Sequence, residues 1–298
     1  HVLTMNETAR AYALQYVYMA AFAAPFSGVV FAINAALRGS GDTRLPFWIM
    51  MSVGILNVIF SVIFVFADAP LGGWRIGGIA AGTVCGYGIS MCILLFIMLR
   101  RRKKIFTGRK NESLEELVRE RGEHYAPPLY LSFSHLRPDM GMQKRILKIG
   151  LPQAVEVFGM WGIQMFCLSI ISELPVKGVL GVHNIAVRIE SLSFLPGFAI
   201  GMAASTLVGQ YLGARNALMA RITIWKCMRY AVIFMTGLGV LFSAFPALFM
   251  EIFSNGSTTL IDTGIPVLRT MLVVEPFFAA CIVMKMSLRG AGDTRRVM

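Results

Sequence analysis

Charged residues in this 298-residue chain gather in short stretches, and the segments between them are apolar and about 20 residues long. Charged side chains make up 15% of the chain and hydrophobic ones 56%, whereas a soluble domain carries about 25% charged residues. A helix of about 20 residues crosses a bilayer and satisfies its own backbone hydrogen bonds there. The sequence therefore predicts an all-α fold, a polytopic transmembrane helical bundle.

Counting the apolar segments predicts about seven membrane spans, at residues 12–37, 46–67, 77–99, 150–171, 180–212, 225–249 and 264–288. Residues 100–145 differ in composition, because they begin with five consecutive Arg and Lys residues and contain a Pro-Pro pair. We expect residues 1–99 to form one transmembrane lobe with three spans and residues 146–298 another with four. Residues 100–145 would be a cytosolic basic linker, with an amphipathic segment at 140–149 lying along the headgroups.

An eight-residue motif occurs twice, starting at Leu37 and again at Leu288, an offset of 251 residues. Each copy follows an apolar segment, and its two glycines can take the left-handed conformation that ends a helix. Asp42 or Thr43 can then cap the next helix. We interpret both copies as tight helix–helix corners, with a gating role for their arginines as the alternative. The corner residues are Arg38, Gly39, Gly41, Asp42, Arg289, Gly290, Gly292 and Asp293.

Lys and Arg mark the cytosolic side of a membrane protein when they gather in short loops. This rule places both corners and the 100–145 linker in the cytosol, so the repeat is parallel. The sequence thus predicts two like-oriented, pseudo-twofold-related halves, both incomplete here, in a multi-pass protein of the cell membrane. The net charge of +12 reflects these loops, and we expect membrane lipids and no nucleic acid as partners.

Further motifs resemble those of one transporter family. Gly150-Leu151-Pro152 opens a span, the segment 203–214 (AASTLVGQYLGA) closes the next, and the two corners complete the pattern. Together they resemble the multidrug and toxic compound extrusion (MATE) family over essentially the whole chain. The resemblance implies a fragment corresponding to helices four to ten of twelve. It also implies a secondary antiporter that exports small organic, often cationic, compounds in exchange for Na⁺ or H⁺ by alternating access, with no other cofactor. We expect the protein to be monomeric.

Two other classes of protein are less consistent with the sequence. A lipid-linked precursor flippase of similar architecture would need a strongly cationic cavity, but the intramembrane carboxylates here match the few arginines. An intramembrane enzyme would need a catalytic motif such as His-Glu-x-x-His or Gly-x-Ser-x-Gly, and the sequence contains neither. We therefore predict that the chain is not an enzyme and has no catalytic residues.

Three carboxylates inside the predicted spans are candidates for cation coupling, because ionisable groups are costly in lipid. Glu156 belongs to a polar helical stripe that can line a cavity or form interhelical hydrogen bonds. Glu190 can act as a protonation switch or form an ion pair with Arg188 or Arg269. Glu275 precedes Pro276, which removes a backbone donor from the helix. The further cavity candidates are Gln153, Gln164, Asn184, Arg188, Met160 and Trp161.

The family's coupling carboxylates cannot be transferred position by position. Several branches place them later in these helices, where this chain has Trp161, Phe166 and Phe278. Na⁺ at Glu156 or Glu275 therefore stays a hypothesis, and Na⁺ and H⁺ both remain open as the coupling ion. We expect Lys285 to extend to the headgroups.

Overall fold

The computed structural model describes residues 7–66, 75–106, 129, 139–175, 178–254 and 256–293. Within these ranges the regular secondary structure is entirely helical. Seven of the helices are long and apolar enough to cross a membrane. The predicted all-α polytopic bundle is confirmed, whereas most of the predicted linker lies outside the described residues.

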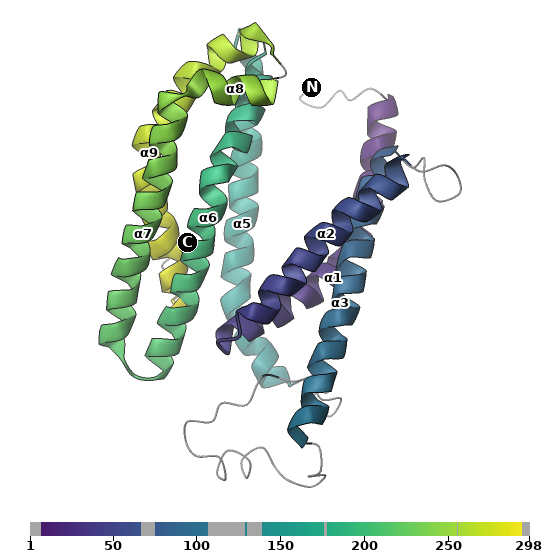
Figure 1. Cartoon of the computed structure of the whole chain (residues 1–298), viewed down its shortest axis with the longest axis vertical. Helices are drawn as coiled ribbons and strands as arrows, with labels where there is room; N and C mark the ends of the chain where they lie inside the picture. Colours follow the sequence, from purple (N-terminus) through teal and green to yellow (C-terminus); the bar gives the residue numbers. More distant parts are fainter. Residues whose placement is uncertain are drawn as a thin grey trace. The chain divides into compact units, whose positions relative to one another are not determined.

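The chain divides into two compact units, His1–Pro138 and Asp139–Met298. The first contains the helices α1 (Glu7–Gly39), α2 (Arg44–Phe66) and α3 (Arg75–Phe106) (Figure 1). The second contains α5 (Met140–Glu173), α6 (Val179–Gly213), α7 (Ala217–Ala244), α8 (Pro246–Ser254) and α9 (Thr258–Gly290).

In the first unit, α3 packs against both α1 and α2 around one apolar core. Its buried side chains are Val30, Leu37, Ile49, Leu94 and Met98. Gly82 lets α2 and α3 approach closely, because a Cβ there would lie 2.7 Å from the backbone nitrogen of Ser61. Polar side chains also join the two helices, since the Ser52 and Ser90 hydroxyls lie 3.0 Å apart.

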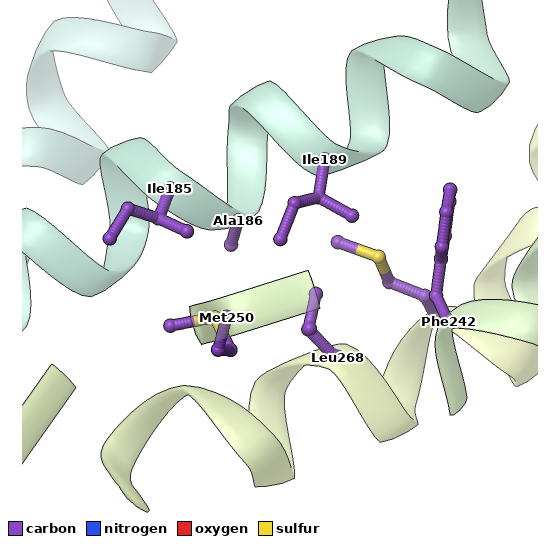
Figure 2. Close-up of a cluster of buried hydrophobic side chains, with 7 residues drawn as sticks. Ile185, Ala186, Ile189, Phe242, Met250 and Leu268 are labelled. Atoms are coloured by element: carbon purple, nitrogen blue, oxygen red, sulfur yellow. The ribbon is translucent and has the colours of Figure 1, made fainter. Parts of the chain in front are cut away.

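In the second unit, α6, α7 and α9 pack along one another, and the short α8 closes one end. Figure 2 shows side chains of four helices converging there: Ile185, Ala186 and Ile189 of α6, Phe242 of α7, Met250 of α8 and Leu268 of α9. A second cluster continues between α6, α7 and α9, formed by Ala204, Ala231, Met235, Ala279, Ile282 and Val283. These two clusters hold the helices that carry Glu190 and Glu275.

Among the predicted boundaries that are wrong, two have a local cause. Residues 140–149 are not a separate segment, because α5 runs without a break from Met140, capped by Asp139, whose carboxylate accepts the Gly141 amide at 2.8 Å. The sixth span does not reach 249, because α7 ends at Ala244 and α8 starts at Pro246. Proline lacks an N–H and disfavours a helical conformation in the residue before it, and Phe245 has left the helical region, with φ −123° and ψ 49°.

The two repeated corners have the same backbone geometry. Gly41 (φ 89°) and Gly292 (φ 83°) take the left-handed conformation. Asp42 N donates to the Leu37 carbonyl at 3.0 Å, and Asp293 N to the Leu288 carbonyl at 3.1 Å. This pattern is the Schellman motif that ends many helices. The prediction for the first glycine of each pair is wrong, because Gly39 and Gly290 remain the last helical residues.

Candidate functional site

Glu275 is the most deeply buried of the three candidate carboxylates. Its residue is 2% exposed, and its Oε2 accepts a hydrogen bond of 2.8 Å from the Ser193 hydroxyl of α6. From α7, Gly239 makes room for it, since a Cβ on Gly239 would lie 3.1 Å from the Glu275 Cγ. Three spanning helices thus surround this carboxylate.

The position of Glu275 beside Pro276 adds a second polar feature. Pro276 lies inside α9, and it has no N–H to donate to the carbonyl four residues earlier, that of Leu272. A buried carboxylate, a hydroxyl and a carbonyl without its helical donor are all oxygen ligands, the type that hard cations take. The Glu275 carboxylate, with the Ser193 hydroxyl bonded to it, can hold either a proton or a small cation.

Glu156 has different neighbours, because it forms ion pairs with two cations of α9. Arg289 Nη2 donates to Glu156 Oε2 at 2.7 Å, and Lys285 pairs with Oε1. The Glu156 side chain is 11% exposed. Lys285 is thus paired with Glu156 between helices, and its expected extension to the headgroups stays a prediction. A role of Glu156 in coupling stays a prediction.

Glu190 is half-buried on α6. Among the described residues it forms no ion pair with Arg188 or Arg269, so the ion-pair alternative is not realised. Arg188 and Asn184 are exposed on the same helix. A protonation switch at Glu190 remains a prediction.

The other α5 candidates face outward. Gln153, Met160 and Gln164 are exposed, and Trp161 is 66% exposed. Gln164 lies 3.5 Å from the His183 ring of α6. α5 has no buried residue, so within this unit these side chains do not contribute to a closed cavity.

At the first corner, Asp42 has two roles. Its Oδ1 accepts the Leu45 amide of the first turn of α2 at 3.2 Å, which confirms the predicted cap. Its Oδ2 lies 2.7 Å from Arg101 Nη1 of α3. Partial burial raises the pKa of the Asp42 carboxyl, but the hydrogen bond and charge of Arg101, together with the backbone donors of Leu45 and Arg44, outweigh it and lower the pKa.

Sequence reasoning missed the partners of these groups. Ser193 lies 82 residues from Glu275, and Arg289 lies 133 residues from Glu156. A weak signal existed for the second site, because Lys285 and Arg289 are four residues apart and share a helical face. No comparable signal marked Ser193 as the partner of Glu275.

Known proteins similar to this chain agree on one family. The MatE family model matches residues 1–63 and 152–298. A probable multidrug resistance protein NorM of Thermotoga maritima is 27% identical over 267 residues, covering 89% of this chain and 52% of that protein. The multidrug resistance protein NorM of Vibrio vulnificus is 25% identical over 211 residues, covering 70% and 40%.

Solved structures show the same fold. A crystal structure of MATE in complex with MaL6 matches with a TM-score of 0.79 at 18% identity, over 96% of this chain and 58% of that one. An outward-facing conformation of a multidrug resistance MATE family transporter matches with a TM-score of 0.71 at 18% identity, over 88% and 52%. This chain spans about half the length of the curated relatives it matches. With its family model matched over most of the sequence, its fold shared and its corners repeated, the chain is a multi-pass membrane protein that belongs to the MatE family.

Proposed function

We propose that this chain forms part of a secondary antiporter that exports small organic compounds, coupled to Na⁺ or H⁺ at Glu275. Family membership and relatives named as multidrug resistance proteins support export. The coupling site is argued from this chain's own residues. Both statements concern a protein of the relatives' length, in which alternating access moves two halves around a central site.

The observation that carries the proposal is the burial of Glu275 between three packed spanning helices. An isolated ionised carboxylate is costly in such surroundings, so it binds a proton or a metal cation when the site is closed. Ser193 supplies one hydrogen bond, which alone does not replace the solvation of a carboxylate. Losing the bound cation would therefore favour a conformation that lets water reach Glu275, and this links ion release to helix rearrangement.

Glu156 is the weaker candidate for ion coupling, because two cations already neutralise it. A Na⁺ ion would have to displace or repel both Lys285 and Arg289, which pair with its two oxygens. We assign Glu156 to holding α5 against α9, and Glu190 to a secondary titrating group. Neither assignment affects the proposal for Glu275.

The exposed side chains of α5 are the proposed substrate contacts. Trp161 and Met160 both have more than half of their surface exposed. An aromatic ring attracts an organic cation through its π face, and methionine adapts to different ligand shapes. We propose that cationic compounds bind this face of α5, with Gln153 and Gln164 as polar contacts.

The test is efflux of a cationic dye from cells that lack their own pumps and express the complete protein. Wild-type cells should export the dye when a Na⁺ or a proton gradient is imposed, and the effective gradient identifies the coupling ion. Glu275→Gln keeps the shape of the side chain but not its charge, and should reduce driven efflux to the level of cells without the protein.

Glu251→Gln is the matched control, because Glu251 is an exposed carboxylate on α8. It should export dye as the wild type does, with the same membrane level of protein. Normal gradient-driven efflux by Glu275→Gln would refute the coupling site while leaving export intact. Absence of efflux from the wild type, with the protein present in the membrane, would refute the exporter itself.

A further inference from the structure

A further site lies at the end of the second unit where the turn 214–216 joins α6 to α7, at the lower end of these helices in Figure 1. A cavity of about 220 Å³ opens there between α6, α7 and α9. Its lining is mostly apolar and includes Ala217, Arg221, Ser287 and Leu288. It is too small for a drug-sized molecule, since pockets for such ligands measure about 300–1,000 Å³.

The polar side chains of this mostly apolar cavity are those of Ser287 and Arg221. Ser287 is 2% exposed, and its hydroxyl has no hydrogen-bond partner in the part of the chain that the structure describes. Buried hydroxyls in proteins are almost always bonded. A hydroxyl that lines a cavity without a partner is therefore suited to bind a ligand atom.

Positive charge lies at the edge of this cavity. Arg221 is exposed, and Ala217 is the first residue of α7, so the partial positive charge of a helix N-terminus lies beside it. Residues 191–250, which include the whole of α7, contain no Asp or Glu. Arg289, two residues after Ser287, is already paired with Glu156. The acidic residue Asp293 follows the lining residue Ala291 by two positions. An anion would find basic partners at this rim.

The depth of the site matches the membrane surface. Trp225 lies one helical turn beyond Arg221 and is exposed, and tryptophan gathers at the headgroup level of membranes. A ligand here would have an apolar part in the cavity and an anionic part at the rim. Phospholipids with a negatively charged headgroup have this shape and are present at high local concentration.

We propose that this cavity binds an anionic phospholipid. Arg221 and the N-terminus of α7 bind the phosphate, and Ser287 donates a hydrogen bond to a phosphate or ester oxygen. Part of an acyl chain packs against the apolar side chains of the cavity. The competing occupant is a segment that follows α9. In the first unit Leu37, which corresponds to Leu288 at the 251-residue offset, is buried against Leu94 and Met98 of α3. A segment that follows α9 would cover Leu288 in the same way.

Native mass spectrometry of the complete protein, purified in the presence of phosphatidylglycerol and phosphatidylcholine, tests this proposal. The wild type should retain one phosphatidylglycerol in preference to phosphatidylcholine. Arg221→Gln should weaken that retention about tenfold, the effect of one lost charge-assisted hydrogen bond. Ser287→Ala should weaken it about threefold, and this small change leaves the packing of α9 intact.

Arg229→Gln is the matched control, because Arg229 is an exposed cation two turns along the same helix and does not line the cavity. It should retain phosphatidylglycerol as the wild type does. Equal retention of both lipids, the result expected if a segment that follows α9 fills the cavity, would overturn the proposal. Equal losses in Arg221→Gln and Arg229→Gln would also overturn it. Displacement of phosphatidylglycerol by inorganic phosphate alone would also overturn it, by identifying a free phosphate site. Unchanged retention in Ser287→Ala would exclude the cavity and leave only surface charge.

Discussion

The two corners of the repeat have the same turn but different neighbours. Gly41 and Gly292 adopt the same left-handed conformation, and the backbone hydrogen bonds of the two turns agree within 0.1 Å. At the second corner, however, a Cβ on Gly290 would lie 2.2 Å from the Ser205 carbonyl oxygen of α6, whereas one on Gly39 would meet nothing within 4 Å. Local sequence determines the conformation of the turn, and the neighbouring helices determine whether a larger residue can replace its glycine.

The helices that lead to the corners explain this difference. α1 and α9 occupy the same interval of the repeat, residues 7–39 and 258–290. Buried positions of α9, namely Leu268, Glu275, Ala279 and Val283, correspond at the 251-residue offset to Val17, Ala24, Gly28 and Ala32, which are exposed in α1. Within the described part of the first unit, no helix therefore covers the face of α1 that corresponds to the packed face of α9.

The largest expected effect comes from adding one methyl group at Gly290. Gly290→Ala would push the α9 backbone away from Ser205 and should lower the free energy of unfolding by about 3 kcal/mol, the upper end for overpacking. Backbone strain does not contribute to this loss, because Gly290 does not have a positive φ and alanine can adopt its conformation. Thermal or denaturant unfolding of the purified protein would measure the change.

Gly39→Ala is the matched substitution at the other corner. In the 1–298 chain it should be neutral or stabilise the helix by up to about 1 kcal/mol, since alanine favours helix over glycine. If both variants unfolded alike in this chain, the contrast between the corners would be refuted. A loss for Gly39→Ala in a longer form of the protein alone would show that a helix equivalent to α6 covers Gly39 there.

A smaller effect on stability is expected when Glu156, the carboxylate that pairs with Lys285 and Arg289, is made neutral. Glu156→Gln keeps the side-chain volume but leaves Lys285 and Arg289 beside each other without a counter-charge. We expect a loss of about 2 kcal/mol in the free energy of unfolding, the range for a partly buried charge left without its partner. Equilibrium unfolding near pH 7 would measure it.

A double-mutant cycle separates the ion pair from packing. Lys285→Met removes one cation, so Glu156→Gln should be less harmful in that background than in the wild type. Equal losses in both backgrounds would mean that Glu156 and Lys285 do not interact, and Arg289 alone would then be the ionic partner of Glu156.

Much of the fold follows from local pattern, and most of the site does not. Apolar length predicts the seven spans, and the spacing of Gly41 and Asp42 predicts a capped corner, because both depend on residues close in sequence. Ser193 and Glu275 meet because helices far apart in sequence pack together in one register. No periodicity within α6 or α9 encodes that register, so the pairing could be found only in the folded chain.

The smallest expected effect concerns Asp42 at the first corner, and it depends on pH. The pKa of this carboxyl is lowered in the folded protein, so its contribution is complete above the unfolded pKa of about 4 and disappears as the pH falls through the folded value. At pH 7, Asp42→Asn should cost about 1 kcal/mol, because the ion pair with Arg101 is partly exposed and asparagine can still accept the Leu45 amide. The free energies of unfolding of wild type and variant should converge as the pH is lowered below about 4. A difference that stayed constant down to the acid limit would show that Asp42 does not act through its charge, and the first corner would then lack the electrostatic contact that Arg289 provides at the second.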